Sequence, residues 1–248
     1  DIIEIHFYNS NPQLTSELIN LSQGSISYDF LDKSLSNDEI DSLVRRTSSP
    51  SKAKTITVIG DHKSSIIEEI ALNLSKGVEY LNLMTDKGVE ANQIASKIQF
   101  NFKIGANYFF EIGKIRAARI LWNVILKEYN VIDPSMMIHS ETSNVKNSEE
   151  DENYHILRNT TKAMSAIIGG CDSLSINPHN DSETKIDFSN RIARNIQHIL
   201  KEEAFFDKVN NPADGSYYIE ELTKEISEKA WKCFQEIEKR GGYLAANK

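Results

Sequence analysis

The sequence of 248 residues has few cysteines, an excess of acidic over basic side chains and no long apolar run. Its two cysteines, Cys171 and Cys233, are far apart and follow no metal-binding or redox spacing. The net charge of −8 argues against a general nucleic-acid binder, which needs a basic surface to neutralise phosphates. No apolar run reaches the length of a membrane span, and no secretory leader pattern is present. We therefore expect a globular protein of a reducing, cytoplasmic compartment.

Two further absences concern cofactor binding. The sequence has no Gly-x-Gly-x-x-Gly or Gly-Lys-Ser/Thr motif, which counts against an ordinary nucleotide-binding open sheet. The six histidines show no metal-ligand spacing among themselves, so we assign them no metal role.

The most informative stretch runs from Lys97 to Trp122. Its first half alternates apolar and polar side chains with a period of two, which predicts a strand. After Gly105 the apolar residues recur every three or four positions, which predicts an amphipathic helix. A parallel strand is normally apolar on both faces, so polar side chains on one face indicate that this face lines a cavity or a partner. The polar strand positions are Lys97, Gln99, Asn101 and Lys103.

The same order, a strand followed by a helix, repeats along the chain. Ser65 and Glu68 form a capping box for one helix, and Asp187 is a possible cap for another. Residues 86–96 are predicted to be a polar connector. Six such units imply a parallel sheet with right-handed crossovers, but periodicity alone permits an open doubly wound sheet and an incomplete barrel equally. Strands are predicted at 2–7, 25–30, 55–59, 97–104, 136–139 and 173–176, and helices at 12–21, 36–44, 66–81, 107–125, 156–168, 188–204 and 217–239.

Several sequence blocks follow one another in a specific order and spacing. They are the segments 104–109, 116–122, 163–174, 188–195 with Glu202-Glu203, and 214–218. Together they resemble the substrate-binding barrel of the methylmalonyl-CoA mutase family, and the resemblance covers roughly residues 95–242. The Gly-Gly-Cys-Asp-Ser piece at 169–173 resembles the small, or beta, subunit of the two-subunit bacterial enzymes, which is taken to be non-catalytic.

The resemblance implies an α/β fold, namely an incomplete (β/α)8 TIM-type barrel of about six parallel strand–helix units. We expect residues 1–248 to form a single partial barrel domain of a longer chain. In this alignment the chain starts at the third barrel strand and lacks the first two units and the separate cobalamin domain.

The resemblance also implies a function, the adenosylcobalamin-dependent isomerisation of methylmalonyl-CoA and succinyl-CoA. A small-subunit-like barrel would support this reaction by pairing with a catalytic large subunit in a heterodimer. The family's cobalamin signature, Asp-x-His-x-x-Gly, is absent, and the nearest look-alike, Asn177 to Ser182, lacks both the Asp and the Gly. We therefore expect adenosylcobalamin in the holoenzyme and none bound by this chain's own motifs.

The resemblance places five residues at family site positions. His62 falls where the catalytic subunit has its active-site histidine, a hydrogen-bond donor to the thioester carbonyl. Lys97 and Gln99 stand where that subunit has a substrate-contacting Arg and Ser, and Glu141 and Ser27 each replace a Gln. An acid at position 141 would repel an acyl carboxylate. The altered positions favour a chain that has lost the site.

Two alternatives remain open. The chain could be directly catalytic, with His62 as the donor and Lys97 and Gln99 at the acyl group. It could also be a binding module for acyl-CoA that performs no chemistry.

Overall fold

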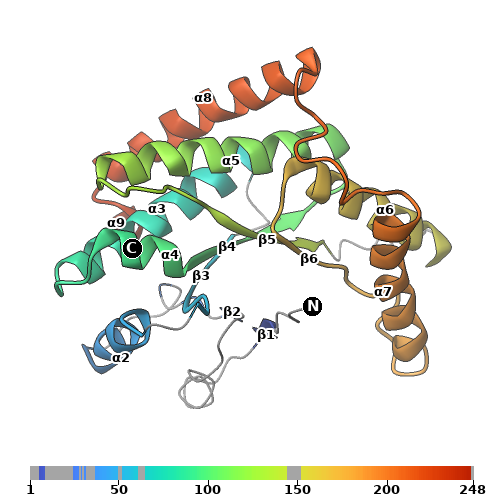
Figure 1. Cartoon of the computed structure of the whole chain (residues 1–248), viewed down its shortest axis with the longest axis horizontal. Helices are drawn as coiled ribbons and strands as arrows, with labels where there is room; N and C mark the ends of the chain where they lie inside the picture. The colour runs from blue at the N-terminus through green and yellow to red at the C-terminus, as the bar shows by residue number, and fades with distance from the viewer. Residues whose placement is uncertain are drawn as a thin grey trace. The chain divides into compact units, whose positions relative to one another are not determined.

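The computed structural model describes residues 6–8, 25–27, 29, 31, 37–49, 52–60, 65–143 and 152–246. Figure 1 shows the helices and strands along the chain. The strands are β1 (His6–Tyr8), β2 (Ser25–Ser27), β3 (Ile56–Ile59), β4 (Ile98–Ile104), β5 (Met137–Thr142) and β6 (Ser173–Ser175). The helices are α2 (Asn37–Thr47), α3 (Ile66–Thr85), α4 (Ala91–Lys97), α5 (Tyr108–Glu128), α6 (Glu152–Gly169), α7 (Ile186–Glu202), α8 (Tyr217–Lys239) and α9 (Tyr243–Ala246).

The strands pair in parallel and in the order of the chain. β1 pairs with β2, and the second sheet has the order β3-β4-β5-β6. β3 and β4 are aligned with Ile56 opposite Ile98, and β5 and β6 with His139 opposite Ser173. A doubly wound sheet reverses its strand order at a switch point, whereas a TIM barrel adds each strand beside the one before it. The sequential order among the described strands is that of a partial TIM-type barrel.

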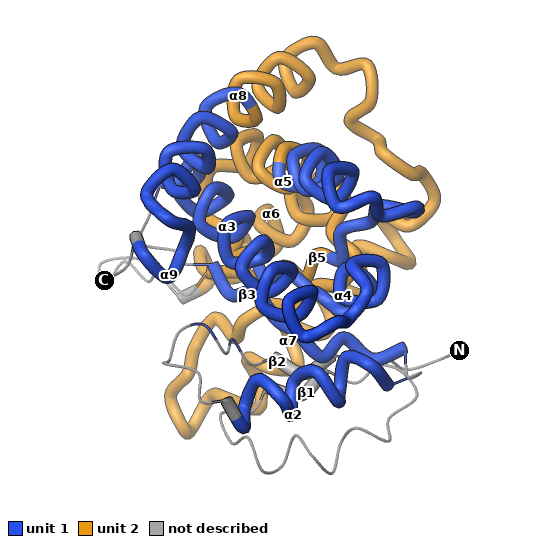
Figure 2. Tube along the Cα trace, turned by 90° about the vertical axis from the view of Figure 1, so that its left-hand side faces the viewer, with its two compact units in different colours: residues 1–101, 118–137, 228–248 blue, residues 102–117, 138–227 orange. Residues whose placement is uncertain are grey.

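The chain forms two compact units, which Figure 2 colours separately. Unit 1 contains residues 1–101, 118–137 and 228–248, and unit 2 contains residues 102–117 and 138–227. The first part of β4 belongs to unit 1 with β3, and its end belongs to unit 2 with β6 and nearly all of β5.

The core of unit 1 centres on Trp122, which is fully buried. Its indole packs edge-on against the ring of Phe100 on β4, with centroids 4.8 Å apart. Gly77 on α3 lies against both rings, because a Cβ built at this position would be 2.8 Å from Trp122 and 3.0 Å from Phe100. A glycine inside the helix thus allows the tryptophan to approach the helix backbone.

The start of α3 also agrees with the sequence. The capping box predicted there is confirmed, with Ser65 and Glu68 bonded reciprocally.

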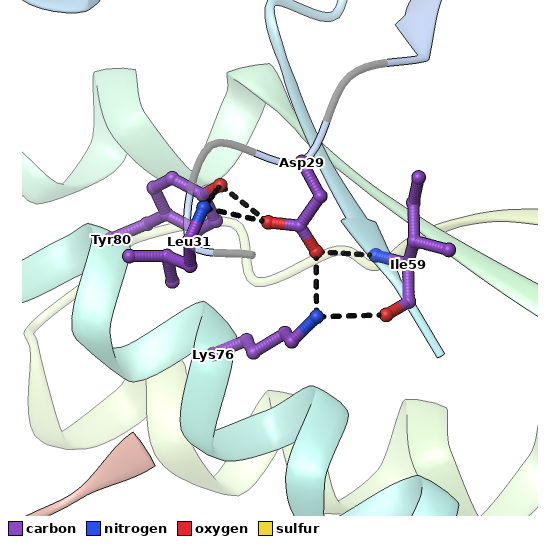
Figure 3. Close-up of polar contacts among 5 residues, drawn as sticks. All are labelled: Asp29, Leu31, Ile59, Lys76 and Tyr80. Carbon is purple, nitrogen blue, oxygen red and sulfur yellow. Dashed lines mark hydrogen bonds and ion pairs between the residues drawn. The ribbon is translucent and has the colours of Figure 1, made fainter. Parts of the chain in front are cut away.

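Unit 1 also buries a network of polar groups around Asp29, drawn in Figure 3. The carboxylate accepts hydrogen bonds from Lys76 Nζ at 2.9 Å and from the Tyr80 hydroxyl at 2.7 Å. It also accepts the backbone N–H groups of Leu31, at 3.1 Å, and Ile59, at 2.9 Å. The side chains of Asp29 and Lys76 are only 1% and 7% exposed, so this is a buried ion pair with its hydrogen-bonding capacity largely filled.

Unit 2 contains two apolar clusters. One contains Ala193, Ile196 and Leu200 of α7 with Ala163 of α6 and Ile176, and the other joins Ile112 of α5 to Ala213 and Ile219. Helix α6 ends as predicted, with Gly170 in the left-handed conformation at φ 89°.

Three helices each send a buried lysine to a backbone carbonyl at the carboxyl end of a strand. Such carbonyls lie where the ladder ends, and a buried carbonyl without a donor is costly. The three bonds run from Lys76 to Ile59 O (3.1 Å) in unit 1, and from Lys114 to Lys103 O (2.6 Å) and Lys162 to Ser143 O (2.8 Å) in unit 2. The carboxyl ends of β3, β4 and β5 are therefore each fixed by the helix that follows.

The structure corrects two local predictions and leaves a third largely untested. The segment 86–96 is not only a polar connector, because α4 forms within it and ends at Lys97. Asp187 does not cap α7; the cap position is Lys185, whose side chain makes no capping bond, and Asp187 lies in the first turn. The first predicted strand, 2–7, is observed at His6–Tyr8, residues 2–5 lie outside the described residues, and so does the helix predicted at 12–21.

Among the helices that the structure describes, none is long and apolar enough to cross a membrane.

Candidate functional site

A charged pair occupies the polar face of β4 and β5 in unit 2. Alternation along a strand places Lys103 on the face opposite Phe102 and Ile104, and Glu141 on the face opposite Ser140 and Thr142. The ammonium group of Lys103 forms an ion pair with the Glu141 carboxylate, and the two side chains are 24% and 19% exposed. The pair is thus partly accessible to a ligand.

A third residue completes this arrangement. The side-chain amide of Asn177, just beyond β6, donates to Glu141 Oε1 at 2.9 Å, and the Asn177 N–H donates to Thr142 Oγ1 at 2.8 Å. Burial acts to raise the pKa of Glu141, but the hydrogen bonds from Lys103 and Asn177 and the nearby positive charges lower it overall. Glu141 is therefore ionised at neutral pH, and its charge is balanced by that of Lys103. The expected repulsion of an acyl carboxylate by Glu141 is correspondingly reduced, but the lysine is engaged.

His139 lies on the same face of β5 as Glu141, two residues earlier, and sequence reasoning gave it no role. Its side chain is 1% exposed, and Nδ1 lies 2.8 Å from the Ser173 hydroxyl at the start of β6. The sequence could have indicated His139, because alternation along β5 places its side chain on the same face as that of Glu141.

The two predicted residues of unit 1, Lys97 and Gln99, do not share a strand. Lys97 is the last residue of α4, so the prediction that it belongs to the strand is wrong. It is buried, and burial, followed by the charge of Lys54, lowers its pKa. Gln99 is on β4 as predicted and is fully buried, with Nε2 donating to Asn101 Oδ1 at 2.9 Å. Its Oε1 atom has no hydrogen-bond partner among the described residues.

The remaining two predicted site residues stay predictions. His62 lies outside the described residues, and Ser27 is described only through its backbone, which aligns with Tyr8 in the β1–β2 pair.

A buried polar cluster that sequence reasoning missed lies at the carboxyl end of β3, where Gly60 meets Glu69 and Asn73. A Cβ built on Gly60 would be 2.9 Å from both Asn73 Nδ2 and Glu69 Oε1, so this position requires a glycine-sized residue. Asn73 is 1% exposed, and neither polar atom of its side chain has a hydrogen-bond partner in the described part of the chain. The sequence could have indicated this cluster, because Asn73 follows Glu69 by four residues and both therefore lie on one mostly apolar face of α3.

The segment that most nearly resembles the cobalamin signature does not fit that cofactor. His179 is buried, its Nε2 atom lies 3.4 Å from the Ser189 hydroxyl, and its ring packs edge-on against Phe188. Asn177 is bonded to Glu141 and Thr142. The histidine is therefore buried against its own unit rather than exposed to a bulky cofactor. In the described ranges, no group of three His, Cys, Asp or Glu side chains could hold a metal ion.

The two arginines of α5 make contacts that hold the fold together. Arg116 bonds to Asn211 and, at 2.6 Å, to Glu220 of α8, whereas Arg119 donates to the carbonyl of Met136 at 2.6 Å. Their guanidinium groups connect segments within each unit, as expected of structural residues.

Sequence comparison identifies relatives over most of the chain. The family model described as Methylmalonyl-CoA mutase matches residues 36–248. The chain is 44% identical over 193 residues to the methylmalonyl-CoA mutase small subunit of Porphyromonas gingivalis, covering 76% of this chain and 31% of that protein. It is 39% identical over 203 residues to the methylmalonyl-CoA mutase of Rhizobium meliloti, covering 79% and 28%. Against the large subunit of Porphyromonas gingivalis it is 37% identical over 182 residues, covering 72% and 26%.

The match spans less than a third of the length of these relatives. It includes α3 to α8, and with them the strand–helix units that carry Lys103, Glu141 and Asn177. The parallel sheet in chain order and the family match over residues 36–248 together establish that this chain belongs to the methylmalonyl-CoA mutase family.

Proposed function

We propose that this chain is a small-subunit-like barrel that supports adenosylcobalamin-dependent isomerisation of methylmalonyl-CoA and succinyl-CoA by pairing with a catalytic large subunit. The observation that carries the proposal is the ion pair between Lys103 and Glu141, whose carboxylate also accepts a hydrogen bond from Asn177. A barrel that binds a dicarboxylic acyl group needs an available cation for the distal carboxylate. Here the cation on the polar face of β4 is already paired with an acid of the same chain.

The sequence comparisons also support the assignment of this chain as small-subunit-like. Within Porphyromonas gingivalis, the small subunit is 44% and the large subunit 37% identical to this chain. The existence of two named subunits supports a heterodimer as the working assembly. In that assembly the cofactor would supply radical chemistry from the partner, and this chain would supply packing surface and exclude water from the shared complex.

The first test is an assay with and without a partner. The chain alone is expected to give no succinyl-CoA from methylmalonyl-CoA in the presence of adenosylcobalamin, and it is expected to co-purify with a co-expressed methylmalonyl-CoA mutase large subunit. Turnover by the chain alone would contradict the proposal and favour the directly catalytic alternative. Binding of acyl-CoA without any association with the large subunit would instead favour a binding module.

The second test replaces Glu141 by glutamine, which removes the negative charge beside Lys103 and keeps the shape of the side chain. Lys103 then becomes available to a ligand carboxylate. The charge-assisted hydrogen bond that Lys103 can then form with the ligand is expected to strengthen binding of methylmalonyl-CoA by about tenfold. Propionyl-CoA, which lacks the second carboxylate, is expected to bind the variant and the unmodified chain alike.

Calorimetric titration of both ligands provides the measurement, and Glu228→Gln on the exposed side of α8 is the matched control. Equal changes for the two ligands would show that the Lys103–Glu141 pair does not face the acyl carboxylate.

A further inference from the structure

Unit 2 contains a pocket of about 370 Å³ at the amino end of β6. Ser173, the first residue of this strand, and Asp172, which precedes it, lie in the pocket wall. The Lys103–Glu141 pair and Asn177 do not line it. In TIM barrels the reaction site lies at the carboxyl ends of the strands, so a pocket at the amino end is a separate feature.

The apolar part of the pocket is built on the core of unit 2. Ile167 of α6, Leu174 of β6 and Phe206 line it, and all three pack against the buried cluster that contains Ile196 and Leu200. The chain reverses after α7 with Phe206 N–H donating to Leu200 O at 3.0 Å. The apolar wall therefore rests on packed side chains and on a backbone bond.

The polar part of the pocket comes from the last turns of α7. Gln197, His198 and Lys201 are exposed, and Lys201 lies one helical turn after both of the others, at i+4 from Gln197 and i+3 from His198. Lys201 lies 3.6 Å from Glu202, and both side chains are more than 60% exposed. Such a surface pair is weak, so a ligand can compete for the lysine.

Two carboxylates also line the pocket, and each already accepts a hydrogen bond. Asp172 accepts the backbone N–H of Ile138 at 2.7 Å, and Asp207 accepts the ammonium group of Lys208 at 3.1 Å. The side chains that α7 contributes to the lining are Gln197, His198 and Lys201, and the positive charge of Lys201 also offsets that of the Asp207 carboxylate.

We propose that this pocket binds a small molecule with an apolar chain and a terminal carboxylate, of the medium-chain fatty acid class. The apolar chain would lie against Ile167, Leu174 and Phe206, and the carboxylate would take hydrogen bonds from Lys201, with His198 and Gln197 beside it. The volume is within the range of small-molecule sites, which are mostly apolar with a few placed polar groups. This site is independent of the proposed role in the mutase complex.

The test is a calorimetric titration of the complete chain with octanoate and with 1-octanol, which lacks the carboxylate. Octanoate is expected to bind about tenfold more tightly than octanol, because the charged hydrogen bond is lost in the alcohol. Lys201→Ala is expected to weaken octanoate binding by about the same factor. Phe206→Ala is expected to weaken both ligands. Lys224→Ala, an exposed lysine of α8, is the control and should change neither.

The reactivity of the two cysteines can show where the ligand binds. Cys171 lines the pocket, whereas Cys233 on α8 does not, and both are half-buried. Saturating octanoate is expected to slow the reaction of N-ethylmaleimide with Cys171 and to leave its reaction with Cys233 unchanged, as measured by peptide mass mapping. Absence of octanoate binding at millimolar concentration, equal affinity for octanol, or binding without protection of Cys171 would each overturn the proposal.

Discussion

Replacing Asp29 by alanine is expected to lower the free energy of unfolding by about 3–5 kcal/mol, because it removes one member of a buried, hydrogen-bonded ion pair. The carboxylate accepts four hydrogen bonds, and its ion pair with Lys76 is 1% and 7% exposed. In the variant, Lys76 would keep its bond to the Ile59 carbonyl and its position 5.0 Å from the Tyr243 ring centroid. Urea denaturation followed by circular dichroism measures the loss.

The matched control is an exposed ion pair of the same residue types in the same unit. Asp41 lies 3.2 Å from Lys87, and these side chains are 54% and 43% exposed. Asp41→Ala is expected to cost less than about 1 kcal/mol. The double variant Asp29→Leu with Lys76→Met removes both charges and should recover much of the loss. An equal cost for Asp29→Ala and Asp41→Ala would contradict the assignment of Asp29 as a buried partner.

The second large effect concerns Trp122. Trp122→Ala is expected to cost about 3–5 kcal/mol, the usual range for removing a large buried aromatic ring. The indole fills the space between Phe100 and Gly77, and its loss leaves a cavity beside α3. Urea denaturation of the variant measures this loss.

The effect of Gly77→Ala on the free energy of unfolding is expected to change sign when Trp122 is also replaced by alanine. In the unmodified chain, Gly77→Ala places a methyl group 2.8 Å from Trp122, and overpacking costs of about 1–3 kcal/mol outweigh the helix-propensity gain of about 1 kcal/mol. In the Trp122→Ala background only the 3.0 Å approach to Phe100 remains, and that ring can move into the vacated space, so Gly77→Ala is expected to stabilise by up to about 1 kcal/mol. A four-member cycle of denaturation curves measures the coupling. Additive effects would show that the two positions do not touch.

Local patterns in the sequence predict most of the regular structure. Helix α8 begins at Tyr217 and ends at Lys239, as its apolar periodicity indicates, and β4 and α5 follow each other as the change of period at Gly105 predicts. Helix α4 was missed because the stretch 86–96 contains few apolar residues and its cap residue, Glu90, makes no side-chain capping bond. A short helix of this kind depends on the packing of Ile94 and Ala95, which a local pattern does not reveal.

Periodicity also overstated the buried surface of two helices. Leu157 of α6 and Ile199 of α7 are among the apolar residues whose spacing predicts these helices, but they are 63% and 48% exposed. An apolar stripe indicates which side of a helix faces the core. How much of that side is buried depends on neighbours that are distant in sequence.

The candidate site was predictable only in part for the same reason. Alternation on β4 identified Gln99 and Lys103 as polar positions, and the family resemblance pointed to Glu141. That Lys103 would neutralise Glu141 depends on the pairing and register of strands 38 positions apart, and that Asp29 would be buried depends on partners on α3. Local sequence cannot supply either, because a charged residue is by default expected at the surface.

The lysines that reach the strand-end carbonyls have an evolutionary consequence. Lys76, Lys114 and Lys162 fix the carboxyl ends of β3, β4 and β5 from the helices behind them. The geometry of these strand ends then depends little on the loops that surround a barrel's reaction site. Loop residues can drift, and catalytic side chains can be exchanged, without selection having to preserve them for folding. A scaffold fixed in this way can keep its fold while the residues around its strand ends change.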